Sequence, residues 1–111
     1  MDISEEIVGN VCVVTAKGRL DGSASAPFVD RLDKLTARQS TFLMDFSGVD
    51  FVTSAGLRAV LTTIKKVKSL NGAIAICGVQ APVREILDIT GLSPMIRIFA
   101  SRPEGLAALA K

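Results

Sequence analysis

The chain has 111 residues, of which 49% are hydrophobic and 22% are charged, and its formal net charge is +2. A chain of this length and composition folds as one globular domain around a single core, so we expect residues 1–111 to form one domain. Histidine is absent. That absence removes the commonest general base and the Ser-His-Asp and Cys-His catalytic arrangements, so the composition argues against an enzyme.

Several other classes of protein are also disfavoured. The longest uninterrupted apolar stretches, such as residues 73–77, are far shorter than the roughly 20 residues that span a bilayer. The N-terminus is acidic and lacks the basic-then-apolar layout of a signal peptide, so we expect a cytoplasmic protein without membrane insertion. Tryptophan and tyrosine are absent. Without stacking aromatics beside a basic groove, direct binding of nucleic acid is not indicated.

Cys12 and Cys77 each lie inside an apolar, strand-like run, and we expect both to be buried, reduced thiols. Because histidine is missing, the chain has few ligands for zinc, and we predict neither a metal site nor a cofactor. The basic cluster Lys65, Lys66 and Lys68 falls near the end of a predicted helix, where cations match the helix dipole. We prefer this interpretation to a nucleic-acid-binding patch.

The first elements in chain order are two strands and a helix. Residues 3–8 predict a weak strand, and the β-branched apolar run over 11–16 predicts a buried one. The apolar residues Phe28, Leu32 and Leu35 recur at helical spacing and predict a helix over 25–38 with these side chains inward and Pro27 in its first turn.

A strand over residues 41–46 and a loop over 47–50 follow. From Ser54 onward apolar residues recur at spacings of three and four, which predicts a helix of about four turns. Asn71 and Gly72 end this helix, with Gly72 available for a left-handed C-terminal position. The inward face of the helix is predicted to comprise Leu57, Val60, Leu61, Ile64, Val67 and Leu70. The remaining elements are a strand over 73–77, a helix over 81–91, a strand over 96–99 and a short helix over 103–110.

The order β-β-α-β-α-β-α-β-α predicts an α/β domain with a mostly parallel sheet, an antiparallel edge strand at the start and about four helices. In open α/β sheets, ligands bind beyond the carboxyl ends of the strands. We therefore expect the loops over 18–23 and 47–54 to meet at that edge and to form the functional surface. Neither loop contains a GxGxxG or Walker sequence, so nucleotide binding is not indicated.

Thr53 and Ser54 open the long helix and allow two interpretations. In the first, one of these hydroxyls is an ordinary N-cap that accepts a backbone N–H two or three residues on. In the second, a hydroxyl held at the helix N-terminus is exposed, and its phosphorylation adds a charge of about −1.5 to −2. That charge would repel a docked partner and the loop carboxylates Asp21, Asp45 and Asp50. The residues alone favour the cap, whereas the chemistry of the second interpretation suits a switch rather than a catalyst.

Motifs that follow one another in order resemble those of a known family. Phe51-Val-Thr-Ser-Ala-Gly-Leu57 resembles the phosphorylation loop of STAS-domain anti-sigma factor antagonists, whose usual pattern is Phe-x-Asp-Ser-Ser/Ala-Gly-Leu. Residues 43–49 are similar to the family's strand before the phosphorylation loop, which carries the motif Asp-x-Ser-x-Val. Residues 18–21 match the Gly-x-Leu-Asp motif that precedes the family's first helix. Residues 82–92 resemble its third helix and the Gly-Leu that follows. The similarity covers nearly the whole chain in register.

The resemblance implies the STAS fold and a partner-switching function without an enzymatic activity. Ser54 aligns with the serine that the partner anti-sigma factor, a serine kinase, phosphorylates, and a PP2C-type phosphatase resets the protein. Unphosphorylated members of the family bind the anti-sigma factor and thereby free the sigma factor. Phosphorylated members dissociate from the anti-sigma factor. The partner surface implied by the match comprises Asp21, Gly22, Ser23, Thr53, Ser54, Ala55, Gly56 and Leu57.

The chain departs from the family pattern at Thr53, where the family usually has aspartate. One negative charge is therefore missing beside the acceptor hydroxyl. The departure also makes Thr53 a second candidate acceptor, since stressosome-type STAS proteins use threonine as well as serine.

Other roles stay open beside this one. The resemblance also fits a STAS subunit of an ABC-type lipid transport system or a stressosome-type scaffold. A response-regulator receiver domain is disfavoured, although Asp45 lies near the end of a strand. Such a site needs an acidic pair after the first core strand and a lysine after the last, and this chain has Lys17-Gly-Arg-Leu and Ala100-Ser-Arg-Pro there.

Overall fold

A computed structural model describes residues 1–110, and the strands within this range form one five-stranded sheet. The strands are β1 (Asp2–Val8), β2 (Val11–Leu20), β3 (Thr41–Val52), β4 (Ala73–Cys77) and β5 (Arg97–Phe99), and they lie side by side in this order. β1 runs antiparallel to β2, and the other neighbouring strands are parallel. The predicted mostly parallel sheet with an antiparallel edge strand is confirmed.

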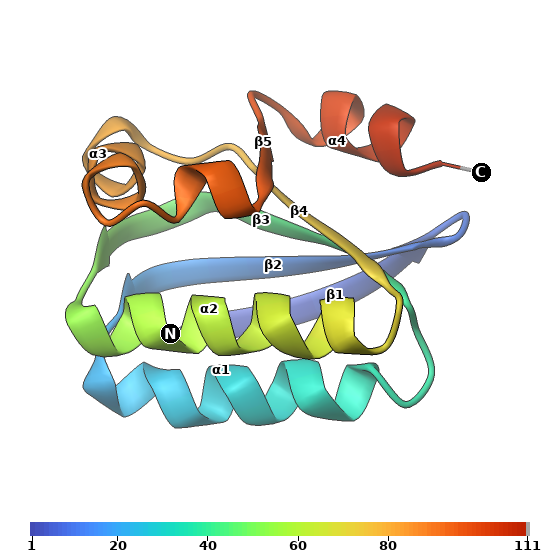
Figure 1. Cartoon of the computed structure of the whole chain (residues 1–111), viewed down its shortest axis with the longest axis horizontal. Coiled ribbons are helices and arrows are strands. Elements are labelled where there is room, and N and C mark those ends of the chain that lie inside the picture. Colours follow the sequence, from blue (N-terminus) through green and yellow to red (C-terminus); the bar gives the residue numbers. More distant parts are fainter. Residues whose placement is uncertain (111) are drawn as a thin grey trace.

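Four α-helices complete the described part of the chain: α1 (Gly22–Leu35), α2 (Ser54–Ser69), α3 (Ala81–Ile89) and α4 (Arg102–Leu109). A 3₁₀ turn, η1 (Ser93–Met95), separates α3 from β5. Figure 1 shows α1 and α2 side by side along one face of the sheet. Among residues 1–110, no helix combines the length and apolar character needed to cross a membrane.

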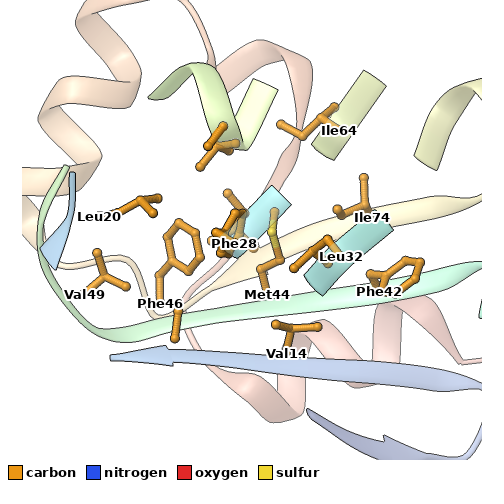
Figure 2. Packing of buried hydrophobic residues seen from close by; sticks show 14 of the residues in the cluster. Val14, Leu20, Phe28, Leu32, Phe42, Met44, Phe46, Val49, Ile64 and Ile74 are labelled. Carbon is orange, nitrogen blue, oxygen red and sulfur yellow. The ribbon is translucent and has the colours of Figure 1, made fainter. Parts of the chain in front are cut away.

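The main core lies between the sheet and the helices α1, α2 and α3. At its centre the rings of Phe28 and Phe46 meet edge to face, with 6.3 Å between centroids (Figure 2). A second, smaller cluster lies on the other face of the sheet, where Leu109 of α4 covers residues of β2, β3 and β4. The predicted inward faces of α1 and α2 are confirmed except at Leu70, which is 51% exposed because α2 ends at Ser69.

Both cysteines are buried and free of disulfides within the described residues, as predicted. Cys12 belongs to the main core and Cys77 to the cluster under α4, so the sheet separates them. Burial raises the pKa of both thiols. For Cys77 the pKa rises to about 11, because the negative charge of Asp45 adds to the effect of burial. The two thiols therefore behave as packing groups rather than nucleophiles.

The predicted loop over 47–50 is wrong, because these residues belong to β3. The strand continues to Val52 by pairing with the end of β2, where Gly48 lies opposite Lys17 and Val52 opposite Leu20. Small and polar residues made this stretch resemble a loop, but Val49 and Val52 are buried. Two register shifts in the ladder between β2 and β3 accommodate the irregular stretch.

The boundaries of α1 also differ from the prediction of 25–38. Asp21 caps the helix, which begins at Gly22 and ends at Leu35. Pro27 therefore lies in the second turn rather than the first, where its ring removes one backbone hydrogen bond. Pro27 is exposed, so water can replace the lost donor.

The end of α2 uses a different left-handed residue from the predicted one. Asn71 has a φ of 60°, and Gly72 does not adopt this conformation. Gly72 is needed for another reason, because a Cβ there would lie 2.4 Å from the carbonyl oxygen of Ser40. Asparagine tolerates the left-handed region better than most residues, so the sequence Asn71-Gly72 satisfies both demands.

The first turn of α2 lies directly against the end of β2. A Cβ on Gly56 would lie only 2.2 Å from the carbonyl oxygen of Leu20. The same oxygen accepts a hydrogen bond from the backbone N–H of Thr53 at 3.0 Å. Glycine at position 56 therefore allows α2 to begin in contact with the C-terminal end of β2.

A partly buried ion pair attaches α4 to the sheet. Nη2 of Arg102 lies 3.0 Å from Oδ2 of Asp45 and donates to the Thr15 hydroxyl at 2.9 Å, and Nη1 lies 3.3 Å from Oε1 of Glu6. The other carboxylate oxygen, Oδ1 of Asp45, accepts from the backbone N–H of Ser47 at 3.0 Å. Burial opposes the ionisation of Asp45, but the hydrogen bonds from Ser47 and Arg102 outweigh burial and hold its pKa below the ordinary value.

Gly56→Ala is expected to destabilise the protein by about 1–3 kcal/mol, because the added methyl group must push α2 away from Leu20. Gly22→Ala is the matched control, since a Cβ at Gly22 meets nothing within 4 Å. The control should change the free energy of unfolding by less than about 0.5 kcal/mol. Urea denaturation of both variants measures the difference, and equal stabilities would contradict the close approach.

Arg102→Ala is expected to cost about 1–3 kcal/mol at neutral pH, because it leaves the buried Asp45 carboxylate without its cation. Since the folded pKa of Asp45 is lowered, its ionised form stabilises the protein above the unfolded pKa of about 3.9, and this contribution is lost as the pH falls through the folded value. The loss caused by Arg102→Ala should therefore shrink below about pH 4. Urea denaturation at neutral and acidic pH measures this, and a pH-independent loss would contradict the ion pair.

Candidate functional site

The C-terminal ends of β2 and β3 lie at the same edge of the sheet, as predicted from the strand order. Leu20 lies opposite Val52 in the parallel ladder, so α1 and α2 begin side by side just beyond it. In Figure 1 both helices start at the left edge of the view, where the two strands end. The residues around Asp21 and those around Ser54 therefore form one continuous surface, although 33 positions separate Asp21 from Ser54.

Asp21 is the N-cap of α1. Its Oδ1 accepts hydrogen bonds from the hydroxyl of Ser23 at 2.7 Å and from the backbone N–H groups of Ser23 and Ala24 at 3.0 and 3.1 Å. These bonds, with the Ser23 hydroxyl contributing most, lower the pKa of Asp21. Its Oδ2 lies 3.8 Å from Nε of Arg19. The carboxylate is therefore held in place and remains ionised at neutral pH.

The choice between Thr53 and Ser54 as the cap of α2 is settled by the hydrogen bonds. Oγ1 of Thr53 accepts from the backbone N–H of Gly56 at 3.3 Å and lies 3.5 Å from the carbonyl oxygen of Leu20, to which it donates. Ser54 is the first residue of the helix and is exposed. Thr53 is thus the cap, and the Ser54 hydroxyl makes no hydrogen bond within the described residues.

The residues predicted to form the partner surface differ in exposure. Gly22, Ser23 and Ser54 are exposed, while Asp21, Thr53, Ala55 and Leu57 are half-buried. Gly56 is buried against β2, so it acts on this surface only by allowing the approach of α2. Leu57 packs against the main core and anchors the first turn.

Two residues beside Ser54 were not among the predicted site residues. Arg19 and Phe51 are opposite one another in the ladder between β2 and β3, and the guanidinium carbon of Arg19 lies 4.4 Å from the centre of the Phe51 ring. Phe51 is 41% exposed. Aromatic residues and arginine are enriched in protein-binding surfaces. The hydrophobic start of the motif Phe51–Leu57 was the available signal, but its exposure depends on the pairing of the strands.

Asp45 does not lie with this surface, contrary to the prediction that a phosphate would repel it. It faces α4 from the opposite side of the sheet and is bound by Arg102. Alternate residues of a strand point to opposite faces, and the extension of β3 to Val52 separates Asp45 from Ser54 along the chain. Asp50 is exposed near the end of β3.

A shallow groove of about 500 Å³ runs between α1 and α2 and reaches the start of α2. Its floor is apolar, with Val29 and Ala59, and charged residues of both helices line its rim. The carboxylates of α1 at the rim are already paired, Asp30 with Lys34 at 3.0 Å and Asp33 with Lys66 at 3.3 Å. The groove thus extends the surface around Ser54 along the helices.

Comparison with known proteins places this arrangement in a family. The family model for the STAS domain matches residues 2–105. The anti-sigma F factor antagonist of Paenibacillus polymyxa is 26% identical over 111 residues, which cover 98% of this chain and 95% of that protein. BtrV of Bordetella bronchiseptica is 32% identical over 66 residues, which cover 60% of this chain and 57% of BtrV.

Solved structures share the fold. An anti-sigma factor antagonist from Mycobacterium paratuberculosis superimposes with a TM-score of 0.88 at 20% identity, covering 97% of this chain and 92% of that one. SpoIIAA from Bacillus has been solved unphosphorylated and phosphorylated, with TM-scores of 0.74 and 0.75 and identities of 15% and 19%. Each covers 96% of this chain, and the matches span 96% and 98% of the SpoIIAA chains. With a family model that spans nearly all of its sequence, this chain belongs to the STAS domain family, as its motifs predicted.

Proposed function

We propose that this protein is an anti-sigma factor antagonist that binds a serine-kinase anti-sigma factor and frees the sigma factor until Ser54 is phosphorylated. The observation that carries the proposal is the exposed Ser54 hydroxyl, which has no hydrogen-bond partner among residues 1–110 and lies on a helix whose cap is another residue. A kinase can therefore reach this oxygen without first breaking a contact of the fold.

The relatives support this proposal. The full-length relative from Paenibacillus polymyxa is an anti-sigma F factor antagonist. SpoIIAA, which shares the fold, carries phosphate in one of its solved forms. In this chain Ser54 occupies the position of the phosphorylated serine in the family motif, and the domain would supply the acceptor hydroxyl while the partner supplies the catalytic groups.

Phosphorylation would act through charge rather than through refolding. A phosphate on Ser54 adds about −1.5 to −2 charge to a surface on which Asp21 is already ionised. The contact between Gly56 and Leu20 holds the first turn of α2 in place, so the new charge stays on the docking surface. A partner seated on Phe51 and the neighbouring helix starts would meet both repulsion and a desolvation cost. A PP2C-type phosphatase would restore binding by removing the exposed phosphate.

Thr53 is the weaker of the two candidate acceptors. Its hydroxyl accepts from Gly56 and donates to Leu20, so a phosphate on this oxygen would break both contacts. The caps of α1 and α2 also differ in charge, since Asp21 is an anion and Thr53 is neutral. Threonine therefore keeps the end of α2 free of negative charge until Ser54 is modified.

Incubation with the cognate anti-sigma factor kinase and ATP is expected to add one phosphate, which mass spectrometry of peptides should locate at Ser54. Ser54→Ala should abolish labelling. Thr53→Val, which keeps the shape of the side chain and removes its hydroxyl, should leave Ser54 as the labelled residue. Phosphate found only at other residues in the wild-type protein would refute the assignment.

The same experiment can be preceded by capture of partners from a cell extract on the immobilised protein. Recovery of a kinase-type anti-sigma factor is expected. Recovery of an ATPase with membrane partners and no kinase would instead support the lipid-transport role and overturn the proposed function.

Thr53→Ala is expected to cost about 0.5–2 kcal/mol of stability, because α2 loses its cap. Ser54→Ala should change the free energy of unfolding by less than about 0.5 kcal/mol, because the Ser54 hydroxyl makes no contact within the described residues. Thermal or urea denaturation of the two variants compares these costs. A larger loss for Ser54→Ala than for Thr53→Ala would show that Ser54 is the cap.

A further inference from the structure

Arg58 lies one helical turn after Ser54 on the same side of α2. Residues four apart in an α-helix are neighbours on its surface, with about 5–6 Å between Cβ atoms. Arg58 is exposed and lines the groove between α1 and α2. Within residues 1–110 its guanidinium makes no ion pair or hydrogen bond. It is therefore a free cation next to the proposed phosphorylation site.

Another cation near this surface, Arg19, already has partners. Arg19 lies over the ring of Phe51 and near Asp21. A new anion on Ser54 would compete with these contacts for Arg19, whereas Arg58 has no contact to lose. Lys34 and Lys66 lie near the far ends of α1 and α2, where they pair with Asp30 and Asp33 at 3.0 and 3.3 Å, and both are too distant from Ser54 to reach a phosphate there.

We propose that Arg58 is the intramolecular partner of the phosphate on Ser54, an inference that rests on the proposed function. The order of the pair is the favourable one, since an anion four residues before a cation also matches the helix dipole. Arginine suits phosphate because its planar guanidinium donates two parallel hydrogen bonds to phosphate oxygens. No other residue of α2 before Arg58 carries a charge.

This pairing gives phosphorylation a second effect on the docking surface. In the unmodified protein, Arg58 offers the one cation among the lining residues of the groove to an acidic group of the anti-sigma factor. After modification, Arg58 is drawn to the phosphate of its own chain. The surface thus gains negative charge and at the same time loses an available positive charge, so both changes oppose the same partner.

The test uses the full chain with phosphoserine incorporated at position 54 by genetic encoding, so that no kinase is required. The second pKa of the phosphate is measured by ³¹P NMR titration. A nearby cation favours the dianion and lowers this pKa, so Arg58→Gln is expected to raise it by about 0.3 units or more. Arg58 is exposed and glutamine is a good helix former, so the variant is expected to fold.

Lys65→Gln is the matched control. Lys65 lies on the same exposed stripe of α2 as Arg58, but it is about 16 Å from Ser54 along the helix axis. Its removal changes the net charge by the same amount and should leave the pKa within about 0.1 units, since the distance exceeds the Debye length at physiological salt. An unchanged pKa in Arg58→Gln, or equal shifts in both variants, would overturn the role of Arg58. Such a result leaves kinase labelling of Ser54 intact, and failed labelling leaves this titration intact, so the two failures are distinguishable.

Discussion

The carbonyl oxygen of Leu20 is the point on which the candidate site depends. It accepts the backbone N–H of Thr53 at 3.0 Å, lies within 3.5 Å of the Thr53 hydroxyl, and leaves no room for a Cβ on Gly56. One oxygen at the end of β2 therefore fixes where α2 begins. Because β2 and β3 are parallel neighbours, this contact also brings the start of α1 beside the start of α2. The position of Ser54 follows from these constraints without any contact of its own hydroxyl.

Thr53 and Ser54 have different roles at the start of α2, and this difference is what would allow Ser54 to serve as the proposed switch. Thr53 satisfies the helix end, so Ser54 can gain a phosphate without loss of the cap. The first turn of α2 contains no acidic residue. A phosphate would therefore be the first negative charge at that end of the helix, with Arg58 one turn away. The rigid start of α2 and its neutral cap together favour a change of surface charge over a change of fold.

Much of this arrangement could be predicted from the sequence, because strand order, helix faces and the meeting of the two loops depend on periodicity and chain direction. The assignment of residues 47–50 failed, since their composition resembles a loop while pairing with β2 makes them a strand. The pair of Asp45 and Arg102 joins positions 57 residues apart, and no local pattern reports such a contact. The choice of Thr53 over Ser54 as the cap likewise depends on the contact with β2, which the sequence leaves open.

The most direct test of the central claim is calorimetric titration of the cognate anti-sigma factor with the unmodified protein and with the protein phosphorylated at Ser54. The account predicts that phosphorylation weakens binding by at least about tenfold while the thermal stability of the free protein stays the same or rises. Equal affinities for the two forms would contradict the claim that charge on Ser54 controls the partner. Weaker binding accompanied by loss of the folded state would contradict the claim that the switch works without refolding.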